Sequence, residues 1–330
     1  MIAKKAVFAA ALTAMVCAAS TKAQTDKQWD ICTHKTPASP DERIEACRLL
    51  LRGSEQAQFP SEISALPRPS QQAEILNNLG VAYLQSGHFD DAVRIFGEGI
   101  RLAQTVDGPG HTTLEFMLRG NRAVAFRVSK QWDRALEDND VMVRVQPNAE
   151  HFADRCLTRF NWGQQLDLAL ADCSEAVRLE PNNEKALQVR GALRLSQKDY
   201  AGALADYDAL LRAHPSPENL NGRCWTRAVW GQQLDLALAD CNSAVRERPE
   251  DARKLDSRAF VNFRLGIYPN AVADCAHALA IVSNKPTSLY VCGLAKLRMG
   301  DTDGGSADIA AAKKLDPKIA DTYAGYGVKP

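Results

Sequence analysis

The chain has 330 residues, and its 40 basic and 40 acidic side chains give a formal net charge of zero at neutral pH. This balance, without any basic run, excludes a protein that grips a nucleic-acid backbone through counterion release, and it gives no basis for attraction to an anionic membrane. The hydrophobic share of 45% is ordinary for a folded chain with buried cores.

Residues 1–23 are predicted to be a secretory signal peptide. Lys4 and Lys5 precede the 14-residue apolar run AVFAAALTAMVCAA, and small residues favour cleavage after Ala23. The run is shorter than the roughly 20 residues that a membrane-spanning helix needs. We therefore expect a periplasmic or secreted protein without membrane insertion after cleavage; the alternative is an uncleaved anchor.

Residues 24–52 are predicted to form an N-terminal helical segment linked by a cysteine pair, in which Ser39 or Asp41 caps a helix that opens near Pro40. The stretch 53–72 contains three prolines and few large apolar residues, so it is predicted to be a linker.

A 34-residue period organises the rest of the sequence. The stretch WGQQLDLALADC occurs twice, at 162–173 and 230–241, two periods apart. An alanine or glycine stands three positions before each aspartate of the series, and a proline follows most of these small residues after twelve positions. This period is typical of a helix–turn–helix unit that stacks on its neighbours, with the proline ending the second helix. The periodic aspartates are Asp138, Asp172, Asp206, Asp240, Asp274 and Asp308.

Two stretches resemble the tetratricopeptide (TPR) repeat. Residues 72–100 place Leu79, Gly80, Tyr83 and Phe96 in the positions of that family, and 185–215 is a second match. The resemblance implies an all-α fold, a TPR α-solenoid in which helix–turn–helix repeats wind into a right-handed superhelix behind the short disulfide-linked N-terminal segment. Residues 320–330 would form a capping tail. The seven predicted repeats are 73–106, 116–149, 150–183, 184–217, 218–251, 252–285 and 286–319.

The sequence departs from the regular repeat in two places. An extra stretch, 105–113, separates the first two repeats, and the two WGQQLD turns each carry one residue more than the other turns. Both departures affect the local register and not the predicted fold.

The cysteines favour disulfide bonds. Without Cys17 their number is even, as expected of an exported chain whose bonds form in an oxidising compartment. In an antiparallel helical hairpin, residues equidistant from the turn can face each other, which predicts four sequential pairs; buried free thiols are the alternative. The predicted pairs are Cys32 with Cys47, Cys156 with Cys173, Cys224 with Cys241, and Cys275 with Cys292.

The sequence predicts no catalytic, metal or cofactor site. CxxC and HExxH are missing, and so are GxSxG, SxxK, Walker A and GxGxxG. Because the aspartate series recurs in every repeat, we interpret it as structural ion pairs with arginines of the first helices and not as paired catalytic carboxylates. These arginines are Arg122, Arg155, Arg190, Arg223 and Arg258.

The resemblance implies a concave groove, lined by the first helix of each repeat, that grips a peptide. Aromatic side chains there could anchor a partner; alternatively they pack against neighbouring helices or against the chain's own termini. A subset of the family binds terminal carboxylates through groove lysines, which are missing beside Asn77 and Asn121. The candidate partner-binding residues are Asn77, Val81, Leu84, Arg127, Phe160, Trp225, Phe260, Phe263 and Tyr290.

These features predict a non-catalytic scaffold or adaptor of the bacterial cell envelope that binds a protein or peptide and needs no cofactor. One alternative is a binding protein for a cell-wall fragment or lipid, which would show a deep pocket with convergent polar groups instead of an open groove. A hydrolase with a site near His111 is the remaining alternative.

Overall fold

The structure, a computed structural model, describes residues 22–53, 68–106 and 109–328. Most of the predicted signal peptide and of the predicted linker therefore lies outside the described residues. The chain divides into two compact units, Met1–Gln164 and Gln165–Pro330, here called unit 1 and unit 2. The described residues of both units contain helices and turns and no β-strand, in agreement with the predicted all-α class.

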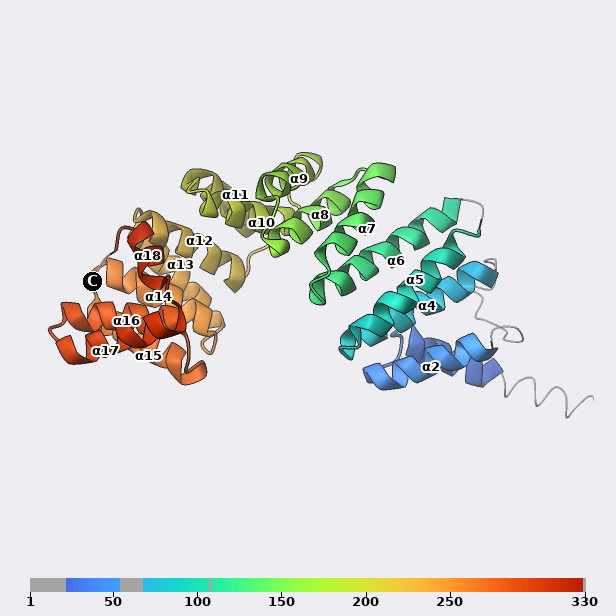
Figure 1. Ribbon diagram of the computed structural model, residues 1–330, viewed down its shortest axis with the longest axis horizontal. Helices are drawn as coiled ribbons and strands as arrows, with labels where there is room; N and C mark the ends of the chain where they lie inside the picture. The colour runs from blue at the N-terminus through green and yellow to red at the C-terminus, as the bar shows by residue number, and fades with distance from the viewer. Residues whose placement is uncertain (1–21, 54–67, 107–108, 329–330) are drawn as a thin grey trace, which may run out of the picture. The chain divides into compact units, whose positions relative to one another are not determined.

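Unit 1 is built of helices that pack on their neighbours in sequence (Figure 1). The first helices α4, α6 and α8 also contact one another in that order, which places their exposed faces in one row. After a helix over residues 22–32 come α2 (Pro40–Gly53), α4 (Arg68–Gln85), α5 (Phe89–Ala103), α6 (Pro109–Val128), α7 (Trp132–Val145) and α8 (Ala149–Trp162).

Unit 2 continues the same pattern of stacked helix pairs. Its first helices α12, α14 and α16 contact one another, and the short final helix α18 packs on α16 and α17. The helices are α9 (Leu166–Leu179), α10 (Glu184–Ser196), α11 (Tyr200–Ala213), α12 (Pro217–Trp230), α13 (Leu234–Glu247), α14 (Ala252–Arg264), α15 (Tyr268–Ile281), α16 (Pro286–Arg298), α17 (Thr302–Leu315) and α18 (Ile319–Gly325).

Two helices begin outside the bounds predicted for their repeats. Helix α4 begins at Arg68, inside the predicted linker 53–72, because Pro69 stands in the first turn, where its missing N–H costs no helical hydrogen bond. Helix α6 begins at Pro109, so the C-terminal part of the extra stretch 105–113 lengthens the first helix of its repeat.

The longer WGQQLD turn is accommodated by left-handed backbone. After α12, Gly231 has φ of 77° and Gln233 has φ of 54°. The helix itself begins at Pro217, one residue before the predicted start of its repeat. Because α12 starts one residue early, it compensates for the extra residue in the turn, and Asp240 on α13 keeps its place in the 34-residue period.

Glycines mark the closest helix contacts. A Cβ atom on Gly80 would lie 2.4 Å from Cε1 of Phe96, and one on Gly222 would lie 2.3 Å from Cε1 of Tyr207. Each aromatic ring fills the space that a side chain would take, so both positions need glycine for packing.

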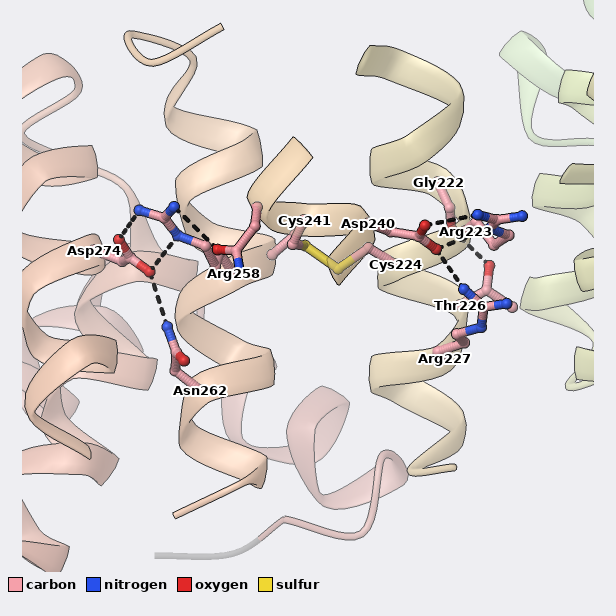
Figure 2. The surroundings of a disulfide bond; sticks show 12 residues. Gly222, Arg223, Cys224, Thr226, Arg227, Asp240, Cys241, Arg258, Asn262 and Asp274 are labelled. Atoms are coloured by element: carbon pink, nitrogen blue, oxygen red, sulfur yellow. Dashed lines mark hydrogen bonds and ion pairs between the residues drawn. A yellow bond between two sulfur atoms is a disulfide. The ribbon is translucent and has the colours of Figure 1, made fainter. Parts of the chain in front are cut away.

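Disulfide bonds cross-link neighbouring helices. Cys32–Cys47 joins the helix over 22–32 to α2, Cys224–Cys241 joins α12 to α13 (Figure 2), and Cys275–Cys292 joins α15 to α16. Their Cα separations of 5.1, 5.6 and 5.9 Å lie in the normal range for disulfides. These three pairs are those predicted. Cys156 and Cys173 are also disulfide-bonded.

Candidate functional site

Three aspartates of the periodic series, Asp138, Asp206 and Asp240, are buried acceptors for pairs of arginines. The Asp206 carboxylate accepts hydrogen bonds from Nη2 of Arg190 at 2.6 Å and from Nη1 of Arg194 at 2.8 Å. The Asp240 carboxylate accepts a hydrogen bond from Nη2 of Arg223 at 2.7 Å and another from Nη1 of Arg227 (Figure 2).

Asp138 in unit 1 is held in the same way by Arg119 and Arg122. The Asp138 carboxylate is only 2% exposed, and its lone pairs are directed at guanidinium groups. These aspartates therefore tie first and second helices together, and their geometry does not suit a catalytic base.

Arg155, the remaining arginine predicted for this series in unit 1, donates from Nη1 to Oδ1 of Asp140 at 2.9 Å. Arg223 makes the corresponding bond to Asp208 at 2.8 Å in unit 2. Both bonds run from a first helix to the second helix of the preceding repeat, so the ion pairs also link neighbouring repeats.

The candidate groove of unit 1 combines an amide pair with half-buried apolar side chains. Nδ2 of Asn121 on α6 donates to Oδ1 of Asn77 on α4 at 2.9 Å. Asn77 is buried, whereas Val81, Leu84 and Phe160 are half-buried. The first-helix face thus keeps apolar surface within reach of a partner.

Arg127 lies on this face of α6 without a bonded partner among the described residues. Burial lowers the pKa of its guanidinium, whereas the charge of Asp154 on α8 acts in the opposite direction. The side chain remains a cation because arginine ionises far above neutral pH. It is a partly desolvated positive charge to which neighbouring helices supply no hydrogen-bond acceptor.

The candidate groove residues of unit 2 are covered by the chain's own end. The Tyr323 ring lies 5.2 Å from that of Phe260 and 5.0 Å from that of Tyr290, and the Tyr326 ring lies 5.9 Å from that of Trp225. These side chains form an aromatic cluster in which Phe260 and Tyr290 are fully buried.

Arg264 fixes the position of the final turn, since its Nη1 donates to the backbone oxygen of Tyr326 at 2.8 Å. Trp225 is half-buried and Phe263 is 8% exposed. The surface predicted as the more aromatic half of the groove is therefore closed in this structure, and the partner-binding role of its residues stays a prediction.

A small cavity remains beside this cluster. It has a volume of about 250 Å³, and its walls include Leu195, Tyr200, Trp225 and Tyr326. Pockets for small molecules usually measure about 300–1,000 Å³, so this cavity accommodates a single side chain and not a larger ligand.

The described residues contain no cluster of three or more His, Cys, Asp or Glu side chains that could hold a metal ion. Of the helices in the described part of the chain, none combines the length and apolar character needed to cross a bilayer.

The sequence left open that the groove aromatics pack against the chain's own termini, but Tyr323 and Tyr326 were not predicted as the residues that do so. Tyr323 follows Tyr290 by 33 residues, nearly one period, so the final segment continues the first-helix pattern. Arg264 carries no such periodic signal.

The helix pairs, their 34-residue period and the shared ion-pair pattern define an α-solenoid of stacked helical hairpins. A family model, the tetratricopeptide repeat, matches residues 72–113, which covers α4 and α5 and the beginning of α6. This stretch therefore matches the tetratricopeptide repeat, and the described helix pairs have a TPR-like solenoid fold.

Solved structures share this fold at low sequence identity. A tetratricopeptide repeat protein from Parabacteroides merdae is 18% identical with a TM-score of 0.59, over 78% of this chain and 98% of that chain. Cut9–Hcn1 of the APC/C is 12% identical with a TM-score of 0.54, over 92% of this chain and 59% of that chain. No curated protein sequence matches the chain.

Proposed function

We propose that the protein is a non-catalytic interaction scaffold that binds a peptide or protein segment along the first helices of unit 1. Arg127 carries the proposal. A half-buried guanidinium without a bonded acceptor among the described residues is favourable when a partner supplies one, because a charge-assisted hydrogen bond then replaces lost hydration.

The chemistry of this face indicates what the partner segment presents. A carboxylate would complement Arg127, and apolar side chains would cover Leu84 on α4 and Phe160 on α8, which are half-buried. The Asn77–Asn121 pair adds amide groups that could bond to a peptide backbone. We infer an acidic segment with flanking apolar residues.

The cell envelope is the proposed location. The apolar leader at 1–23 supports it, and so do the disulfides Cys32–Cys47, Cys224–Cys241 and Cys275–Cys292, because such bonds persist in oxidising compartments. The cavity of about 250 Å³ beside the aromatic cluster is too small for the alternative ligand, a cell-wall fragment or lipid. A cavity of about 650 Å³, lined by Arg248, Asp251 and Lys285, is large enough, so the alternative is kept as an outcome of the test.

Site-specific crosslinking tests the proposal. A photo-crosslinking residue replaces Leu84 or Phe160 in the full chain, expressed in its native envelope, and Val145, which is 59% exposed on α7, serves as the control position. We expect a stoichiometric protein adduct from the two groove positions and none from the control position.

Arg127→Ala should remove these adducts without changing the thermal unfolding midpoint by more than a few degrees. Adducts that persist in this variant, or that form equally at Val145, would contradict the proposed surface. Native mass spectrometry of the same preparation detects a small ligand, which would favour the alternative instead.

A further inference from the structure

One repeat of unit 2 lacks the second arginine of the ion-pair pattern. In the two preceding repeats, that arginine lies 12 residues before Asp206, as Arg194, and 13 residues before Asp240, as Arg227. In the next repeat, Asn262 stands 12 residues before Asp274. At this position a shorter, neutral side chain replaces the second arginine of the two preceding repeats.

The shorter side chain of Asn262 fills only part of the space that Arg194 fills in the earlier repeat. Its Nδ2 donates to Oδ2 of Asp274 at 3.1 Å, as Nη1 of Arg194 donates to Oδ2 of Asp206 at 2.8 Å. Arg258 supplies the remaining cation through Nε and Nη2, at 2.9 and 2.6 Å from the Asp274 carboxylate (Figure 2).

A cavity of about 360 Å³ lies at this position. Its floor is buried, since Asn262 is 3% exposed and Asp274 is 7% exposed. Its mouth opens between Asn242 on α13 and Asn270 on α15, which are both exposed, with Leu238 on one wall.

The floor carries an unsatisfied acceptor. Oδ1 of Asn262 is buried and has no hydrogen-bond partner, because its Nδ2 faces Asp274. Buried polar atoms in folded proteins are nearly always hydrogen-bonded, so this oxygen marks a place where a donor is missing. The site therefore has a cavity, a buried acceptor and one cation fewer than the Asp206 and Asp240 sites of the two preceding repeats.

We propose that this cavity binds a guanidinium group, presented by an arginine side chain of a partner or by a free arginine-like molecule. The guanidinium would donate to Oδ1 of Asn262 and approach the Asp274 carboxylate beside Arg258, which also lines the cavity and donates from Nη1 to Oδ1 of Asn242 at 3.3 Å. The side-chain amide of Asn270 would contact its outer edge. Leu238 would cover the methylene stem, as apolar surfaces do for long cationic side chains.

Other ligand classes fit less well. An anion would face the Asp274 carboxylate, and the one cation that lines the cavity, Arg258, is already paired with that carboxylate. A divalent cation would have a single carboxylate, already paired with Arg258, where such ions need several oxygen ligands. A planar fork of N–H donors suits adjacent acceptors better than the point charge of an ammonium group does. This site is separate from the face of unit 1 and does not depend on the function proposed for it.

Calorimetric titration of the full-length oxidised protein tests the proposal. The probes are acetyl-Gly-Arg-Gly-amide, ethylguanidinium, and acetyl-Gly-Lys-Gly-amide as the matched control. We expect one equivalent of the arginine peptide to bind, at least fivefold more tightly than the lysine peptide. Binding of ethylguanidinium alone would identify a small molecule as the source of the group, and tighter binding of the peptide would identify a protein.

Asn262→Arg supplies the missing guanidinium from within the chain, so it should abolish binding of the probes and raise the thermal unfolding midpoint. Asn262→Ala removes the acceptor without filling the cavity, and it should weaken binding at least tenfold even if Asn262→Arg does not fold. Arg194→Asn would create a second cavity of the same kind and raise the stoichiometry toward two. Absence of binding to the wild-type protein, or undiminished binding by both Asn262 variants, would overturn the proposal.

Discussion

Replacing Tyr323 with alanine should detach the C-terminal helix from unit 2. The side chain is 2% exposed and its ring contacts those of Phe260, Tyr290 and Tyr326 at centroid distances of 5.0 to 5.7 Å. Truncating a large buried aromatic residue to alanine costs about 3–5 kcal/mol. Helix α18 has only seven residues, and an isolated helix of that length is unstable, so the lost contacts cannot be replaced by local structure.

Guanidinium chloride unfolding, followed by far-ultraviolet circular dichroism, measures the global cost, and hydrogen exchange of α18 and α16 locates it. Thr322→Ala is the matched control, since Thr322 is exposed on the same helix and an exposed substitution usually changes stability by at most about 0.5 kcal/mol. We expect Tyr323→Ala to lower the free energy of unfolding by about 3–5 kcal/mol and to leave Phe260 and Tyr290 accessible. A change below about 1 kcal/mol, with α18 still protected from exchange, would refute the reasoning.

Three further predictions follow from buried groups. Replacing Cys224 and Cys241 together by serine should lower the free energy of unfolding by about 3 kcal/mol, because the bond closes a loop of 17 residues; chemical denaturation measures this, and an unchanged midpoint would contradict it. Burial, with a smaller effect of Asp206, raises the pKa of Tyr207 from 10.0 to about 12. The folded state therefore holds this proton more tightly. The stabilisation from this group is complete below pH 10 and is lost as the pH rises from about 10 to about 12, by up to about 3 kcal/mol. Tyr207→Phe should remove this part of the alkaline loss of stability, and an unaltered loss would exclude it. Asp240→Ala removes the carboxylate shared by the buried Arg227 and the half-buried Arg223, of which only Arg223 keeps another carboxylate, that of Asp208. It should cost about 3 kcal/mol in urea unfolding, whereas the exposed Asp235→Ala should change little; equal effects would argue against a structural role.

The sequence predicts those features that repeat. The period locates the helix pairs and the aspartates, and symmetry about each turn gives three disulfide pairs that the structure forms. Boundaries at irregular segments are predicted poorly, as for α4 and α6, because propensity allows a helix to extend wherever packing covers it.

The candidate sites are harder to predict than the fold. Periodicity identifies a first-helix position, but whether Phe260 faces a partner or the chain's own Tyr323 depends on where the final segment folds. Asn262 could be recognised only as a departure from the pattern, once its equivalence to Arg194 and Arg227 was established by their shared acceptor.

The disulfide between Cys275 on α15 and Cys292 on α16 joins the second helix of one repeat to the first helix of the next. Arrays of this kind tend to fray from their ends, because each repeat is held only by its nearest neighbour. A covalent bond across that boundary prevents the last repeat from peeling away by itself. Opening of the C-terminal end therefore becomes a concerted event of two repeats, and a reductant would divide that event into two smaller steps.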